Sequence, residues 1–430
     1  MTQKASDSLN RDRISNLPEH LIGSILERLA VQDAVRTSVL SKRWRYKWTT
    51  MTSLVLDEEF AKKIVKYGAF GLNGFIRIVN QVLILHPRPI SKLTLYIPNM
   101  FLDSFQEVDQ WMLFLSRNGV RELVLINANW LYLLPSHVFS CSELRNLKLA
   151  NCIFKSPLGF VGFPYLEDVF LRNVVFGTNF SGAMVNLPRL RKLTLHSCTH
   201  VYNLDINAPN LQCLSLVTCP DAMLCRLANN PSLTVVGITL RRPLENFLRV
   251  EYMNLARLLS ILRNVQQFFI DGHFIKFLSA DRMLNLLPHA DNSLNRLWFI
   301  NFQLNDMEQL LSALSLLQTS PNLVRLCIVN VPMEPQIIQY DEQQALNHLG
   351  SRNCLRRTLN QLQIVDIRGL EGSKTELLFI KLLLAHSPSI NKMTIQPSAA
   401  CDASKRLNIA KDVMRFPRAS PRAEIVYLDP

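Results

Sequence analysis

A pattern of leucines recurs along the middle of the sequence and constrains the fold more than any other feature. Copies beginning at Leu144, Leu190 and Leu211 read LRNLKLANC, LRKLTLHSC and LQCLSLVTC, which all fit Leu-x-x-Leu-x-Leu-x-x-Cys. Looser copies begin at Ile90, Val120, Leu166, Leu233, Val265, Leu294 and Leu323. From Leu123 to Val236 the second apolar position recurs every 21–24 residues, and the steps outside that stretch are longer. A period of this length predicts stacked repeat units.

Each unit is expected to form a short strand whose Leu-x-Leu pair points to one side, because side chains alternate along a strand. One unit cannot bury that side alone, so neighbouring units must stack and share a core. The fold class is therefore α/β, and the spacing is that of a leucine-rich-repeat solenoid with a parallel β-sheet on its concave face. Cys152, Cys198 and Cys219 end the regular copies and are predicted to be small buried fillers.

Positions that flank the strand leucines should face away from the core. They include aromatic and cationic residues, which are the side chains that anchor protein–protein contacts. The predicted target-binding residues are Phe170, Arg172, His196, Phe269, Trp298 and Arg325. Lys148, Thr194, Ser215, Asp271 and Asp366 occupy similar outward positions. The alternative is that a loop or the carboxy-terminal segment covers the aromatic residues.

The segment 11–48 has the spacing of a small helical module. Leu17, Leu21, Ile25 and Leu29 lie four residues apart, with Ile22 and Leu26 beside them, and predict one apolar stripe on a helix. A second helix is expected over 32–39, and a third after Ser41. Three helices in about 40 residues enclose little core, so something else should cover the stripe. Either the rest of the chain or a partner protein could do so.

This segment resembles the F-box of plant F-box proteins. The matching residues are Asp12-Arg13-Ile14-Ser15-x-Leu17-Pro18, Ile25-Leu26-x-x-Leu29 and the run Asp33–Arg45. The resemblance implies binding to a Skp-type adaptor, which tethers the chain to a cullin-based ubiquitin ligase. By motif position the adaptor-binding residues are Leu17, Pro18, Ile22, Ile25, Leu26, Val35, Val39, Leu40 and Trp44.

The segment 359–430 resembles the FBD domain that closes many plant F-box/leucine-rich-repeat proteins, with matches at Gly369, Glu376, Leu377 and Lys392-Met393-x-Ile395. We expect a strand over 362–367, a helix over 375–386, a strand over 390–395 and an edge strand near 423–428. A repeat array needs a terminal cap, which is the role expected here. The predicted domains are an F-box (11–50), a leucine-rich-repeat solenoid (51–358) and an FBD-like cap (359–430). Helical insertions are expected over 240–260 and 336–357.

The composition limits the classes of function and the cellular compartments that fit this chain. The formal net charge is +13, but no five like charges are consecutive, so nucleic-acid binding is not favoured. Nine cysteines without an export signal favour the cytoplasm or the nucleus, and no run is long enough to span a membrane. His196, Cys198 and His200 should point apart, so no metal or other cofactor is expected.

We find no catalytic motif, so the chain is not expected to be an enzyme. The resemblance implies instead a substrate receptor of a Skp–cullin–F-box ligase that binds a target protein. The alternatives are an F-box protein with a non-degradative role and a basic repeat protein that binds nucleic acid.

Overall fold

The structure is a computed structural model. It describes residues 17–67, 71–99, 104–177, 185–201, 206–219, 230–240, 264–279, 293–330, 342–351, 354–355 and 357–430. The contacts between residues divide the chain into two compact units. The first unit is Met1–Leu190 with Cys198–His200 and Asp205–Asn207, and the second is Arg191–Ser197 with Val201–Leu204 and Ala208–Pro430.

The amino-terminal module, residues 17–50, folds around a small core of its own. Its elements are α1 (Glu19–Leu26), α2 (Val31–Arg36) and the 3-10 helices η1 (Thr37–Val39) and η2 (Lys47–Thr50). Pro18 precedes α1, and its carbonyl accepts hydrogen bonds from the backbone N–H groups of Leu21 and Ile22. The core consists of Ile22, Leu26, Val31, Ala34, Trp44 and Trp48.

The expected third α-helix is wrong. Residues 41–46 form turns, closed by a hydrogen bond from the Trp44 N–H to the Ser41 carbonyl, and η2 follows. A regular helix here would place like charges one turn apart, with Lys42 beside Arg45 and Arg43 beside Lys47, which disfavours it. The second predicted helix is confirmed over α2, with η1 continuing it to Val39.

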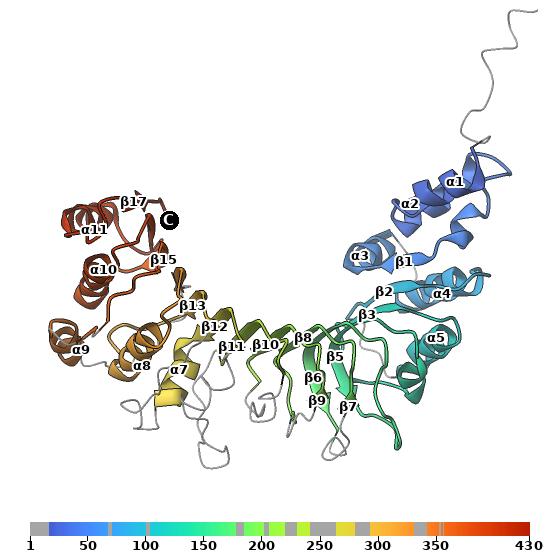
Figure 1. The fold of residues 1–430 in the computed structure, drawn as a ribbon. Helices are drawn as coiled ribbons and strands as arrows, with labels where there is room; N and C mark the ends of the chain where they lie inside the picture. Colours follow the sequence, from blue (N-terminus) through green and yellow to red (C-terminus); the bar gives the residue numbers. More distant parts are fainter. Residues whose placement is uncertain are drawn as a thin grey trace, which may run out of the picture. The chain divides into compact units, whose positions relative to one another are not determined.

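The first unit continues as a parallel sheet in the order β1-β2-β3-β5-β6, with β4 paired to β5. Its strands are β1 (Ser53–Leu56), β2 (Lys92–Ile97), β3 (Glu122–Asn127), β4 (Tyr132–Leu133), β5 (Asn146–Phe154) and β6 (Asp168–Phe176), with β7 (Val185–Asn186) paired to β9 (Ile206–Asn207). Its helices are α3 (Glu58–Tyr67), α4 (Gly71–Ile84), α5 (Gln106–Ser116) and the 3-10 helix η3 (Ser136–Ser140). Figure 1 shows α3, α4 and α5 beside one another along this sheet.

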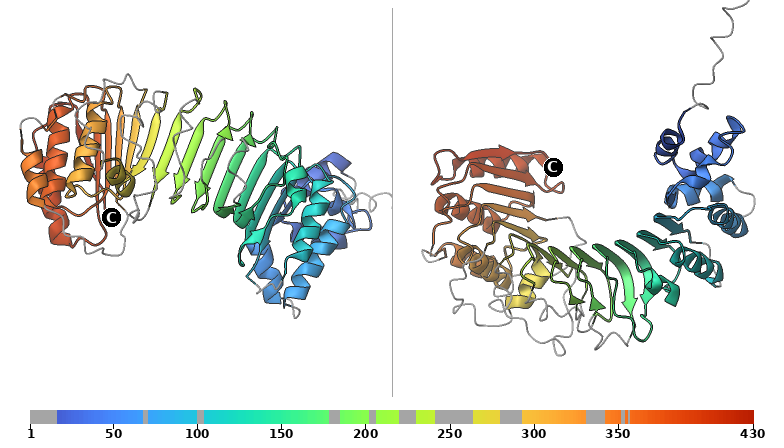
Figure 2. Two further views of the ribbon diagram at one scale, coloured as in Figure 1. Left: turned by 90° about the horizontal axis from the view of Figure 1, so that it is seen from below. Right: turned by 45° about the vertical axis from the view of Figure 1, so that its right-hand side comes forward.

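The second unit repeats the arrangement in the order β8-β10-β11-β12-β13-β14-β15-β16-β17, again all parallel. Its strands are β8 (Lys192–His196), β10 (Cys213–Val217), β11 (Val235–Thr239), β12 (Gln267–Asp271), β13 (Arg296–Ile300), β14 (Arg325–Val329), β15 (Ile364–Leu370), β16 (Lys392–Pro397) and β17 (Glu424–Tyr427). Its helices are α7 (Gly272–Ser279), α8 (Met307–Gln318), α9 (Glu342–Leu349), α10 (Lys374–His386) and α11 (Ala403–Arg415). Figure 2 shows the strands of each unit side by side.

The predicted leucine pairs form the core of both units. Leu193 and Leu195 on β8 are buried, as are Leu297 and Phe299 on β13, and the register places equivalent pairs directly beside one another on adjacent strands. Each side chain of this size contributes about 1.5–3 kcal/mol when it is fully buried. The predicted repeat architecture is therefore confirmed.

A left-handed residue follows the apolar pair in six of the described copies, which the sequence pattern had not indicated. Four residues after the second apolar position of a copy, the backbone φ is positive at Asn151, Asn173, Ser197, Thr218, Asn301 and Gly369. The backbone N–H of Ser197, Thr218 and Asn301 donates to a carbonyl of the next strand, so the ladder continues through the bend. The bend turns the next residue inward, and Cys152, Cys198 and Cys219 are buried there as predicted.

The carboxy-terminal segment has the predicted strands, as β15, β16 and β17, and the predicted helix, as α10. A full capping box starts α10, because Ser373 and Glu376 each accept a hydrogen bond from the other's backbone N–H. Helix α11 was not predicted from the sequence. Part of the second predicted insertion is confirmed by α9, whereas 241–260 and 336–341 lie outside the described residues. No helix within the described ranges is long and apolar enough to cross a membrane.

The left-handed position in β15 gives a direct test of the repeat geometry. A Cβ on Gly369, where φ is +76°, would collide with the Asn330 carbonyl oxygen. Gly369→Ala should therefore lower the free energy of unfolding by at least about 2 kcal/mol. Gly237→Ala is the matched control in the same unit, because its Cβ would meet only ordinary contacts of 3.5 Å or more. Urea unfolding measures both, and equal stabilities would contradict the assignment.

Candidate partner-binding surfaces

The amino-terminal module exposes large apolar side chains near the start of the chain. On α1, Leu21 and Ile25 are 42% and 41% exposed, and they lie four residues apart on one face. After α2, Val39 and Leu40 are 86% and 62% exposed. We call these four residues the apolar face. Side chains that remain this exposed in a folded module favour a partner contact.

Three of the predicted adaptor-binding residues are located inside the module. Ile22, Leu26 and Trp44 are 2% exposed or less, so they hold α1 against the rest of the module and do not form part of its surface. Their prediction as surface contacts is corrected in this respect. The reason is that a helix in a small module uses one side of a wide apolar stripe for its own core. Leu21, which the predicted contacts omitted, shares the exposed side with Ile25.

The remaining predicted residues differ in position. Pro18 is exposed and Leu17 is half-buried, with its carbonyl accepting a hydrogen bond from Arg43 Nη2 at 3.3 Å. Val35 lines a cleft on the side of the module that faces α3 and α4. Lys47 pairs with Glu19 at 2.5 Å, and this hydrogen bond lowers the pKa of the Glu19 carboxyl below its usual value.

The module is fixed to the first repeat strands by specific contacts. The Glu27 carboxylate accepts hydrogen bonds from the backbone N–H and the hydroxyl of Thr52, both at 2.8 Å. Trp48 packs edge-on against His86, with ring centroids 5.3 Å apart. His86 is buried, and this burial lowers the pKa of its imidazole despite a hydrogen-bonding contact with the Val82 carbonyl.

In the second unit, two predicted target-binding residues form one aromatic pair. Phe269 on β12 lies directly beside Trp298 on β13, and their rings stack with centroids 4.1 Å apart and planes 11° apart. Both side chains are half-buried, so part of each ring faces solvent. The neighbouring position on β11 is Gly237, which has no side chain to fill the space beside Phe269.

Arg325 and Asp366 form an ion pair on the same sheet. The Arg325 guanidinium donates two hydrogen bonds to one carboxylate oxygen of Asp366, at 2.7 and 3.0 Å. Burial alone would raise the pKa of Asp366, but hydrogen bonds from Arg325 and Thr394 outweigh it and lower that pKa. This ion pair holds Arg325 in place near Cys327. Cys327 on β14 is the residue that pairs with Trp298 on β13.

The other outward positions have different roles. Phe170 is half-buried and Arg172 is exposed in the first unit, whereas His196 is half-buried in the second. Asp271, predicted to face solvent, is buried and accepts hydrogen bonds from the backbone N–H groups of Leu240 and Phe274. Its position at the end of β12 lets it cap the start of α7, so its prediction as an outward side chain is wrong.

Cys152 and Cys327 are free thiols, and burial raises the pKa of Cys152 to about 12 and that of Cys327 to about 11. Such thiols are poor nucleophiles at neutral pH. Cys198 points into the core and its Sγ lies 3.5 Å from the Leu171 carbonyl oxygen, while His200 is exposed. Within the described residues, no group of three or more His, Cys, Asp or Glu side chains could hold a metal ion.

Comparison with known proteins identifies this combination of module and repeats. The F-box domain model matches residues 14–56, and a model described as "FBD-associated F-box protein At5g56370, LRR repeats" matches residues 108–328. The chain belongs to the F-box/FBD/LRR-repeat family, which confirms the resemblance found in the sequence.

The similar proteins include whole-length relatives from Arabidopsis thaliana. F-box/FBD/LRR-repeat protein At1g13570 is 32% identical over 97% of this chain and 98% of its own length. F-box/FBD/LRR-repeat protein At5g56420 is 23% identical over 97% of this chain and 99% of its own length.

Burial of His86 predicts a pH dependence at the junction of the module and the first repeat. Its pKa is lowered in the fold, so the unfolded chain takes up the proton first as the pH falls below about 6.5. Stability should therefore fall with decreasing pH, by at most about 1.4 kcal/mol per pH unit from this residue. Thermal unfolding at pH 7.5 and 5.5 should show a smaller loss for His86→Phe than for the unmodified chain. Identical losses would exclude this role.

Proposed function

We propose that this protein is the substrate-recognition subunit of a Skp–cullin–F-box ubiquitin ligase. In this proposal the apolar face of the amino-terminal module binds a Skp-type adaptor, through which the chain joins a cullin. The single observation that carries the proposal is the exposure of Leu21, Ile25, Val39 and Leu40 in a module that already has a core of its own.

The energetics of such a contact favour a partner over solvent. Covering large apolar side chains gains about 25 cal/mol for each Å² removed from water, and a few well-placed side chains dominate most interfaces. Leu17 and Pro18 extend the contact at the start of α1. Ile22, Leu26 and Trp44 act by holding α1 and the following turns in shape.

The target protein is proposed to bind the sheet of the second unit, at the stacked pair of Phe269 and Trp298. Rigid aromatic pairs lose little conformational entropy on binding and are frequent interface anchors. Arg325, which Asp366 holds in place, adds a cation at the start of β14. It lies two residues before Cys327, the residue that pairs with Trp298. His196, Phe170 and Arg172 are further candidate contacts on outward positions.

The chain itself would supply proximity rather than chemistry. Holding a target next to a ubiquitin-loaded partner enzyme raises the effective concentration of a target lysine. Five buried cysteines are free thiols, which fits a reducing compartment, so we place this activity in the cytoplasm or the nucleus: Cys141, Cys152, Cys327, Cys354 and Cys401.

Charged substitutions on the apolar face test the adaptor contact. The double variant Ile25→Asp and Val39→Asp should weaken adaptor binding at least 100-fold, because an interface that covers a carboxylate must desolvate it. Both side chains are exposed, so the thermal midpoint should stay unchanged. Leu407→Asp, at a 55% exposed leucine on α11, is the matched control and should bind normally. Calorimetric titration with purified adaptor gives the affinities, and wild-type affinity of the double variant would refute the contact.

Loss of the stacked pair tests target binding separately. Trp298→Ala should reduce target capture by about 30-fold, the effect of a 2 kcal/mol interface anchor, and should leave adaptor affinity unchanged. Trp130→Ala, at an exposed tryptophan in the first unit, serves as the control. Quantitative crosslinking with the proteasome inhibited compares the captured proteins. The same proteins captured at the same level by both variants would contradict the proposed site.

A further inference from the structure

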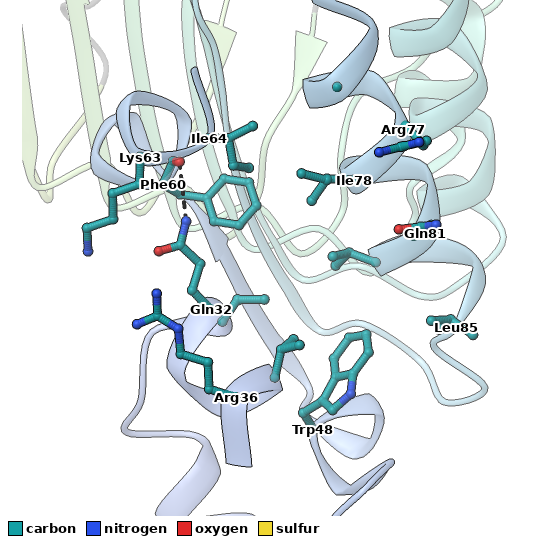
Figure 3. Close-up of a pocket in the computed structure, with 14 residues that line it drawn as sticks. Gln32, Arg36, Trp48, Phe60, Lys63, Ile64, Arg77, Ile78, Gln81 and Leu85 are labelled. Carbon is teal, nitrogen blue, oxygen red and sulfur yellow. Dashed lines mark hydrogen bonds between the residues drawn. The ribbon is translucent and has the colours of Figure 1, made fainter. Parts of the chain in front are cut away.

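A cleft of about 610 Å³ lies within the first unit, between the amino-terminal module and the helices α3 and α4 (Figure 3). The module contributes Val31, Val35 and Trp48 to its wall, and the helices contribute Phe60, Ile78 and Val82. The volume lies in the range of pockets that hold small organic ligands. These walls would bind an apolar body of matching size.

The charged residues that line the cleft are all cationic. Arg36, Lys63 and Arg77 line it together with the amides of Gln32 and Gln81, and none of the lining residues described is a carboxylate. Figure 3 shows Arg36 and Lys63 on the same side of the cleft and Arg77 on the opposite side. Arg36 also pairs with Asp33 at 3.1 Å, but both side chains are exposed and such a pair contributes little.

We propose that this cleft binds a small amphipathic anion, an apolar body that carries one carboxylate or sulfonate group. The apolar part would lie against Val31, Phe60 and Ile78, and the anionic group would lie between Arg36 and Lys63. An inorganic anion would leave the apolar walls unused, and a cationic amphiphile would be repelled by the basic residues. This assignment stands independently of adaptor and target binding.

A ligand at this position would act on the junction of the module and the repeats. The walls come from both sides of the junction, so an occupant contacts both at once. A ligand that binds only the folded junction stabilises it by mass action. Occupancy should therefore raise the thermal midpoint of unfolding.

The test uses the full chain and three probes with the same twelve-carbon tail, all below their micelle concentrations. Dodecanoate should bind and raise the thermal midpoint, whereas dodecyltrimethylammonium and dodecanol should bind at least tenfold more weakly. The double variant Arg36→Gln and Lys63→Gln should weaken dodecanoate binding at least tenfold. Lys62→Gln is the matched control on α3, because Lys62 pairs with Glu58 instead of lining the cleft, and should change binding less than twofold.

Filling the cleft provides the second variant. Ile78→Trp should abolish dodecanoate binding while far-ultraviolet circular dichroism shows the folded chain. Equal binding of the three probes, or unchanged dodecanoate binding by Ile78→Trp, would overturn the proposal. Competition between dodecanoate and purified adaptor would also overturn it, because the cleft would then belong to the adaptor interface.

Discussion

The structure depends on one constraint, which is that no repeat unit can bury its own strand leucines. Leu297 and Phe299 are fully buried only because β12 and β14 lie on either side of them and place Phe268, Ile270, Leu326 and Ile328 at the same register positions. After β13, the left-handed Asn301 keeps this register because its backbone N–H donates to the Val329 carbonyl, and the next side chain, Phe302, turns into the core. Where the array ends, the burial becomes incomplete, and the apolar side chains of β17 are only half-buried. There α11 supplies part of the cap, with the Tyr427 hydroxyl donating to the Arg406 carbonyl.

The amino-terminal module differs from the repeat units in how it buries its apolar side chains. Its own core is complete at Ile22, Leu26 and Trp44, and it is joined to β1 by Glu27 and to the end of α4 by Trp48 and His86. Leu21, Ile25, Val39 and Leu40 nevertheless remain in solvent. The repeats bury their strand leucines by stacking, whereas the module leaves these four side chains exposed, which supports the proposed contact with a separate partner.

The period of the leucines predicted the parallel strands and their burial, because a two-residue alternation and a fixed step between units leave few other arrangements. The apolar spacing also predicted the helix over 375–386, and the structure adds a capping box at its start. Other features depend on contacts that a single sequence does not show. The turns at 41–46 lie where a helix would place like charges one turn apart. Helix α11 is rich in charged residues and buries only Ile409 and Val413. The burial of Asp271 depends in part on the backbone N–H of Leu240, which lies 31 residues away. Within the candidate site, the spacing identified Phe269 and Trp298 but could not show that the rings stack, and it could not separate the inner from the outer residues of α1.

In the proposed complex, an adaptor subunit covers the apolar face of the amino-terminal module. Hydrogen–deuterium exchange of the full chain, alone and with purified Skp-type adaptor, tests it most directly. The adaptor should slow exchange over α1, α2 and η1 and leave exchange over β12–β14 unchanged. Equal exchange over residues 19–40 in both samples would contradict it.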